Sequence, residues 1–179
     1  MPSATSRPSR TPPGRLTLSE DDRRTLATWA ADCAERTLPL FDAAAPGDLR
    51  PRAAIEGLRA FARGELRIGP VRALSVAAHA AARDVADPVA TAAARAAGHA
   101  AGTAHMAAHA RGVPAYAAQA RILAGSSDAG GAIADEVRWA LRHASPDVRA
   151  ALRRLPPPLR ASGVLGEAIS ELDARLRGT

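Results

Sequence analysis

The chain contains no lysine, and all 24 of its basic residues are arginine. This absence excludes enzymes that bind a carbonyl substrate or pyridoxal phosphate through a lysine. It also excludes P-loop kinases and ATPases, which hold nucleotide phosphates with a lysine. Codon bias in a GC-rich genome is the simplest explanation for such a composition.

Cysteine, aromatic residues and long apolar runs are also scarce. Cys33 is the only cysteine, so the chain cannot form an internal disulfide, as expected for a reducing compartment. Residues 1–16 lack the apolar segment of a signal peptide, and the apolar run over residues 88–110 is mostly alanine and is interrupted by Arg95 and three histidines. We therefore expect a cytoplasmic protein with no membrane role.

Alanine supplies much of a hydrophobic content of 47%, whereas aromatic residues make up 3%. Small side chains form a core only where helices pack closely, and the scarcity of β-branched residues argues against strands. The 179 residues are enough to bury a real core. We predict an all-α, single-domain bundle or array of about seven to eight helices over residues 15–179, preceded by a disordered tail over residues 1–14.

Capping residues and prolines predict where the helices begin and end. Ser19, Asp87 and Ser145 each stand where an N-cap is expected, the latter two directly before a proline. Pro39 is predicted to end the first helix, and residues 124–131 are predicted to form a flexible loop.

The segment 97–120, AGHAAGTAHMAAHARGVPAYAAQA, contains three of the five histidines. We predict one helix from Pro88 to Arg111, on which His105 and His109 share a face. Such a pair could bind a transition metal if another helix supplied a third ligand, because the segment itself contains no carboxylate. The preferred interpretation is structural: the imidazoles form hydrogen bonds across a close helix contact that Gly98 and Gly102 permit.

Two groups of charged residues lie near the start of the chain. Asp32 and Arg36 are four residues apart on the first helix, and Asp48, Arg50 and Arg52 surround a proline at the start of the second. Helix capping and solvated ion pairs explain such groups. They could also form an exposed polar surface for a partner. Cys33 lies on the apolar stripe, so we expect an inert core cysteine.

Three blocks of the sequence together resemble a bacterial family, the immunity-five-like immunity proteins of polymorphic-toxin systems. The blocks are residues 29–66, beginning WAADCAERTLPLF, residues 97–120, and residues 135–160, DEVRWALRHASPDVRAALRRLPPPLR. The resemblance covers about residues 16–160 and is weakest in the third block, where Ser145-Pro146 and a triple proline interrupt the pattern. The matching positions include Asp32, Cys33, Glu35, Arg36, Asp48, Arg50, Pro51, Arg52, His99, His105, His109 and Tyr116.

The resemblance implies a helical cytoplasmic protein that binds and neutralises a cognate protein toxin. Because no catalytic set is evident, we expect a non-enzymatic protein without a cofactor or a required metal. The candidate partner-binding residues are Asp32, Arg36, Asp48, Arg50, Arg52 and His99. One alternative is a metal-binding helical module or enzyme that uses His105 and His109. A second is a nucleic-acid-associated accessory protein, which is less favoured because no stacking aromatics accompany the arginines.

Overall fold

The computed structural model describes residues 18–125, 128–158 and 162–178. Every regular element in these ranges is helical, which confirms the all-α prediction; there are nine α-helices and one short 3-10 helix, slightly more than expected. The predicted tail over residues 1–14 lies outside the described residues. The elements are α1 (Glu20–Glu35), α2 (Leu38–Ala44), α3 (Arg50–Ala62), α4 (Ile68–Asp84), α5 (Pro88–Gly102), η1 (Ala107–Arg111), α6 (Gly112–Leu123), α7 (Ala129–Arg142), α8 (Pro146–Arg154) and α9 (Gly163–Arg177).

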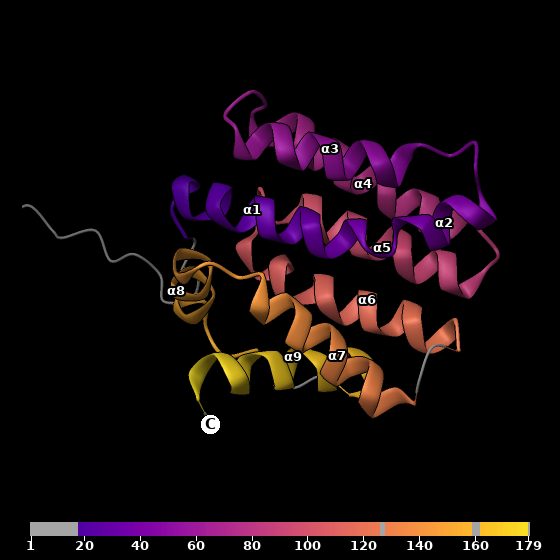
Figure 1. Ribbon diagram of the computed structural model, residues 1–179. Coiled ribbons are helices and arrows are strands. Elements are labelled where there is room, and N and C mark those ends of the chain that lie inside the picture. Colours follow the sequence, from indigo (N-terminus) through magenta and orange to yellow (C-terminus); the bar gives the residue numbers. More distant parts are fainter. Residues whose placement is uncertain (1–17, 126–127, 159–161, 179) are drawn as a thin grey trace, which may run out of the picture.

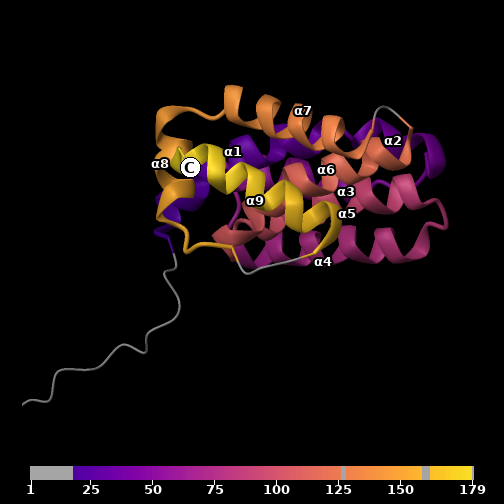
Figure 2. The same cartoon turned by 90° about the horizontal axis from the view of Figure 1, so that it is seen from below.

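Helix α5 runs through the middle of the bundle (Figure 1). It contacts α1, α2, α3, α4 and α6, and ten of its fifteen residues are buried. All ten are alanine or glycine, so neighbouring helices approach it closely. On the other side, α6 packs against α7 and α9, and Figure 2 shows α7 and α4 at opposite edges of the molecule. The short helix α8 lies at one end, in contact with α1 and α9. None of the described helices has both the length and the apolar character required to span a membrane.

The large side chains of the core come mostly from helices that surround α5. Leu26, Phe41 and Phe61 on α1, α2 and α3 have no exposed surface, and Leu152 and Leu172 are equally buried where α8 and α9 meet the bundle. Burial of each such side chain contributes about 1.5–3 kcal/mol. The scarce large residues therefore fill the space that alanine leaves open.

Side-chain caps fix the start of α1 and α5 as predicted. The hydroxyl of Ser19 accepts a hydrogen bond from the backbone N–H of Asp22 at 3.1 Å. One carboxylate oxygen of Asp87 accepts from the backbone N–H groups of Val89 at 2.7 Å and Ala90 at 2.9 Å. Each cap satisfies backbone donors that the first helical turn leaves without a partner.

Side chains also cap the first turns of α7 and α8, and α7 begins earlier than predicted. Ser145 caps α8 as expected, because its hydroxyl accepts from the backbone N–H three residues later at 3.2 Å. Asp128 accepts from the backbone N–H of Gly131 at 2.8 Å, so α7 already begins at Ala129. The predicted loop over residues 124–131 is therefore too long at its C-terminal end.

Pro39 begins a helix instead of ending one, which corrects the prediction. Helix α1 stops at Glu35, and Pro39 lies in the first turn of α2, which starts at Leu38. A proline is tolerated in a first turn because the N–H it lacks would have no partner there.

The helix predicted from Pro88 to Arg111 is also wrong in its second half. Helix α5 ends at Gly102, a turn follows, and the chain re-enters a helical path as η1 and then α6. The backbone N–H of Thr103 bonds to carbonyls of the last turn, which tightens it. Gly102, with its poor helix propensity, stands at this end. His105 therefore lies in the turn and His109 in η1, and they do not share a helix face.

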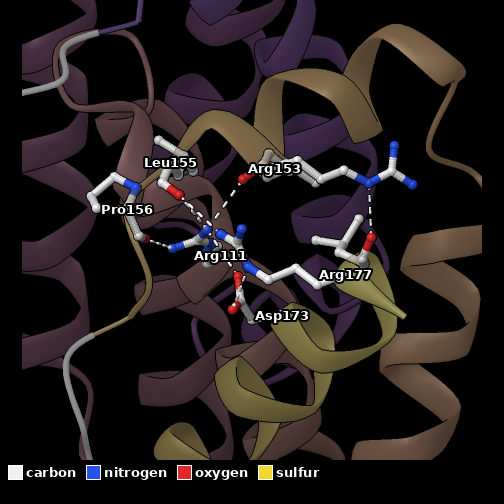
Figure 3. Close-up of polar contacts among 8 residues, drawn as sticks. Arg111, Arg153, Leu155, Pro156, Asp173 and Arg177 are labelled. Atoms are coloured by element: carbon white, nitrogen blue, oxygen red, sulfur yellow. Dashed lines mark hydrogen bonds and ion pairs between the residues drawn. The ribbon is translucent and has the colours of Figure 1, made fainter. Parts of the chain in front are cut away.

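Arg111 joins this central region to the C-terminal part of the chain, and only 4% of its surface is exposed. Its guanidinium donates to the main-chain oxygens of Leu152 at 3.1 Å, Leu155 at 3.3 Å and Pro156 at 2.5 Å, and forms an ion pair with Asp173 at 3.0 Å (Figure 3). One buried cation thereby satisfies carbonyls at the end of α8 and orients α9.

Two further arginines complete this junction. Arg177 pairs with Asp173 at 2.8 Å and donates to the carbonyl of Leu155 at 3.0 Å, and Arg153 donates to the carbonyl of Leu176 at 2.8 Å (Figure 3). Guanidinium groups from three elements, η1, α8 and α9, thus hold the end of α8 against α9.

Candidate functional site

Four of the five histidines meet at one place, where α4, α5, the following turn and η1 come together. We call His79, His99, His105 and His109 the histidine cluster. The ring of His99 lies at its centre: its centroid is 5.4 Å from that of His79, 4.8 Å from that of His109 and 4.7 Å from that of Tyr116. His105 adjoins His109 at 5.6 Å. The cluster is the densest group of ionisable rings in the described chain.

Glycines make room for these rings. A Cβ atom placed on Gly98 would lie 2.6 Å from Cε1 of His79, and one on Gly102 would lie 2.9 Å from Cδ2 of His109. Real Cβ atoms do not approach other atoms so closely, so a side chain at either position would displace the neighbouring imidazole ring. The predicted close contact at these two glycines is confirmed, although it is made by imidazole rings.

The glycine at the start of α6 has the same role. A Cβ on Gly112 would lie 2.6 Å from Nδ1 of His99. In the sequence this glycine belongs to the segment Arg111 to Pro114, whose pattern indicates only a helix break. No signal in the sequence places it beside His99, because the fold brings them together.

Burial keeps the cluster uncharged at neutral pH. Loss of solvation, followed by the charge of neighbouring histidines, lowers the pKa of His99 to about 3 and that of His109 to about 4. The pKa values of His79 and His105 are also lowered, first by burial and then by nearby arginines. A neutral imidazole has one N–H and one lone pair, which suits the 3.3 Å contact between Nδ1 of His99 and Nδ1 of His109.

The described residues contain no group of three or more His, Cys, Asp or Glu side chains arranged to hold a metal ion. Nδ1 of His79 and Nδ1 of His105 are buried without a hydrogen-bond partner. The predicted bonding between imidazoles is therefore seen for His109, whose partner is His99, and not for His105. The metal hypothesis for His105 and His109 is tested by elemental analysis of the purified protein, for which we expect no stoichiometric metal.

The predicted partner-binding residues separate into an inward and an outward group. Arg36 faces inward: it forms an ion pair with Glu136 at 2.9 Å and lies over the ring of Trp139, 4.1 Å from its centroid. His99 belongs to the histidine cluster. Asp32 is on the surface and pairs with Arg59 at 2.8 Å. Arg36 and His99 therefore do not lie on one surface with the others, whereas Asp32 is exposed.

The remaining three residues lie at one edge of the molecule, near the start of α3. Asp48 pairs with Arg50 at 2.5 Å, and Arg50 also reaches Asp84 on α4 at 2.8 Å. Arg52 pairs with Asp42 of α2 at 2.5 Å. Leu49, between the two members of the first pair, has 62% of its surface exposed. We call Asp42, Asp48, Leu49, Arg50, Arg52 and Asp84 the Leu49 edge.

Sequence reasoning missed the most buried acid of the described chain. Glu136 on α7 is 2% exposed and lies between Arg36 and Arg121, with both of which it forms ion pairs. Burial raises its pKa, and the two guanidinium groups oppose that shift. The neighbouring thiol of Cys33 is buried too, and burial raises its pKa well above the ordinary value, which makes it a poor nucleophile.

Comparison with known proteins supplies the identity that geometry does not. The family model described as "Imm-5 like putative immunity protein" matches residues 16–147. The chain belongs to this family. The match includes the first two blocks on which the resemblance rests and ends before the triple proline of the third. No curated protein and no solved structure matches the chain.

Proposed function

We propose that the chain is an immunity protein that acts in the cytoplasm, binds a cognate protein toxin and neutralises it without catalysis. Membership of the family over residues 16–147 is the observation that carries this proposal. The fold is consistent with it, since the described part of the chain is a closely packed helical scaffold with exposed polar edges.

The surroundings of the buried ionisable groups support a role without catalysis. Glu136 and Arg111 are held by partners within the protein, and the cluster rings at His99 and His109 are uncharged and contact one another. Cys33 is a buried thiol with a raised pKa. A catalytic group must instead be free to exchange protons or electrons with a substrate. These residues therefore serve the fold.

Arginine pairing favours a protein partner over nucleic acid. Twelve arginines of the described residues form ion pairs with carboxylates, so half of the 24 arginines already have a charged partner within the protein. Binding to phosphate backbones requires free basic groups on one face. The paired groups instead resemble the polar rim of a protein interface.

We place the toxin-binding surface at the Leu49 edge. An exposed leucine there is surrounded by Asp48, Arg50 and Arg52, which matches an apolar anchor within a polar rim. A partner that covers Leu49 would bury apolar area. Its own charged groups could replace the present partners in the surrounding ion pairs, because each exposed pair is weak in water.

The experiment is co-expression of this chain with each toxin-like domain encoded beside its gene. We expect one such domain to arrest growth alone, to be harmless with this chain, and to co-purify with it. Leu49→Asp should abolish protection, whereas Val76→Asp should not, because Val76 is equally exposed, at 60%, but lies on α4 outside the Leu49 edge. Protection by Leu49→Asp would refute the placement of the surface, and absence of protection by the unaltered chain would refute the proposed function.

A further inference from the structure

A pocket of about 500 Å³ opens between α5, α6 and the start of α9. Its volume is within the range of small-molecule sites. Its walls are partly apolar, with Ala92, Leu123 and Leu165 on the three helices. The polar lining comes from the side chains of Thr91, Arg95, Tyr116 and Gln119.

Arg95 differs from the other arginines of similar burial. In the residues that the structure describes, every other arginine that is buried or half-buried has a carboxylate or a main-chain carbonyl as a partner, as in the cases of Arg36, Arg59 and Arg149. Arg95 is half-buried, and no hydrogen bond or ion pair to it occurs among the described residues. Because no acceptor within the described residues holds this guanidinium, a ligand that supplies an anionic oxygen would bind there favourably.

Two neutral side chains in the same pocket also make no hydrogen bond. Tyr116 and Gln119 are three residues apart on α6, so they lie on one face of that helix, opposite Arg95 on α5. Neither side chain makes a hydrogen bond within the described chain. A phenolic hydroxyl and a side-chain amide can each donate to an oxygen. Three donors thus line one small space.

No carboxylate lines the pocket among the described residues, so its single charge is positive. We propose that this pocket is a binding site for a small oxyanion that carries an apolar group. The anionic group is a carboxylate or a phosphate. Arg95 binds the anionic oxygens, Tyr116 and Gln119 donate to them, and the apolar part rests on Leu123 and Leu165. This site is separate from the Leu49 edge, and the proposal does not depend on the proposed function.

The apolar part of the ligand distinguishes a free phosphate ion from an organic carboxylate. A free phosphate would use only the three donors, whereas an aryl or alkyl carboxylate would also cover the apolar walls. We therefore expect benzoate to bind more tightly than acetate, and both to compete with inorganic phosphate if the anion is bound at one place.

The test is a titration of the isotopically labelled chain with benzoate, acetate and inorganic phosphate, followed by nuclear magnetic resonance. We expect saturable shifts of the Arg95 Nε–H and the Gln119 amide, with benzoate the tightest of the three. A shift of the His99 ring should accompany them, because it lies 4.7 Å from the ring of Tyr116. Arg95→Gln should weaken benzoate binding by about tenfold or more.

Arg83→Gln is the matched control, because Arg83 is an exposed arginine on α4 that does not line the pocket. It should leave benzoate binding unchanged, and Tyr116→Phe should weaken it less than the loss of Arg95. Shifts that grow without saturation, or that respond equally to Arg83→Gln and Arg95→Gln, would show non-specific ion binding and overturn the proposal. Because the toxin takes no part in this titration, its outcome is independent of the immunity assay.

Discussion

At the scale of single residues, the glycines of α5 have the most direct consequence for stability. Gly102→Leu would place a Cβ atom 2.9 Å from Cδ2 of His109, and the rest of the leucine side chain would need further space. We expect a loss of roughly 1–3 kcal/mol in the free energy of unfolding, measured by urea denaturation. Gly69→Leu is the control, because nothing lies within 4 Å of a Cβ there. Equal effects of the two changes would show that the close contact is not needed.

The neutral histidine cluster predicts a dependence of stability on pH. The pKa values of His99, about 3, and of His109, about 4, lie below the ordinary 6.5, so the unfolded chain takes up protons first as the pH falls. The contribution of these two histidines to the free energy of unfolding is therefore fully present above about pH 6.5 and is lost as the pH falls towards 4, by about 3 kcal/mol for each of them.

Denaturation of the double variant His99→Asn, His109→Asn at pH 7 and pH 4.5 measures this contribution. The variant should lose less stability between the two pH values than the unaltered chain, because asparagine does not titrate. Carboxylates contribute equally to both proteins and cancel in the comparison. An identical loss in the two proteins would mean that the histidines are charged or solvated in the folded state.

Buried Glu136 gives the third prediction at this scale. Glu136→Gln would leave Arg36 and Arg121 facing a neutral group, and breaking a buried pair in this way costs about 3–5 kcal/mol. Glu56→Gln, at an exposed position on α3, should change stability by less than about 0.5 kcal/mol. A small effect at Glu136 would indicate that it is already protonated in the folded protein.

Contacts between residues near in sequence are predictable, and those between distant partners are not. The caps at Ser19, Asp87 and Ser145 act on backbone groups two or three residues away, so their pattern is local. Arg36 and Glu136 are 100 residues apart, and no sequence pattern links them. The sequence predicts close contacts at two glycines of α5, but the histidines that make them come from separate elements.

At the scale of elements, the sequence predicts two helix ends wrongly, the end of α5 and the helix end assigned to Pro39. In both cases the sequence does not mark clearly where a helix stops. Helix α5 is buried around most of its circumference, so its sequence has no polar stripe that would mark its end. Without that stripe the alanine pattern continues past Gly102 into the turn and η1. Pro39 is ambiguous because a proline marks either the end of one helix or the first turn of the next, and the sequence does not distinguish these cases.

The junction at Arg111 predicts how the C-terminal helices depend on one side chain. Arg111→Met would remove the donor to three carbonyls and the partner of Asp173, so residues 152–158 and 162–178 should exchange amide hydrogens faster than in the unaltered chain. Arg138→Met, which breaks an exposed pair with Asp135, serves as the control and should leave exchange unchanged. Uniform acceleration throughout the chain would contradict a local role.

At the scale of the whole molecule, alanine determines the architecture. Close packing around α5 gives a bundle with few large core residues. Arginine side chains form ion pairs both on its surface and in its interior. The all-helical class follows from composition alone, because alanine, leucine, arginine and glutamate favour helices. The binding surface does not, since the candidate residues Arg36 and His99 lie apart from the Leu49 edge.

The central claim is neutralisation by binding, and the stoichiometry of inhibition tests it most directly. Toxin activity is measured at fixed toxin concentration, well above the dissociation constant, while this chain is added. A binder inhibits in proportion to the amount added, and we expect inhibition to be complete at about one chain per toxin. Protection by far less than one chain per toxin, increasing with incubation time, would show turnover and contradict the account.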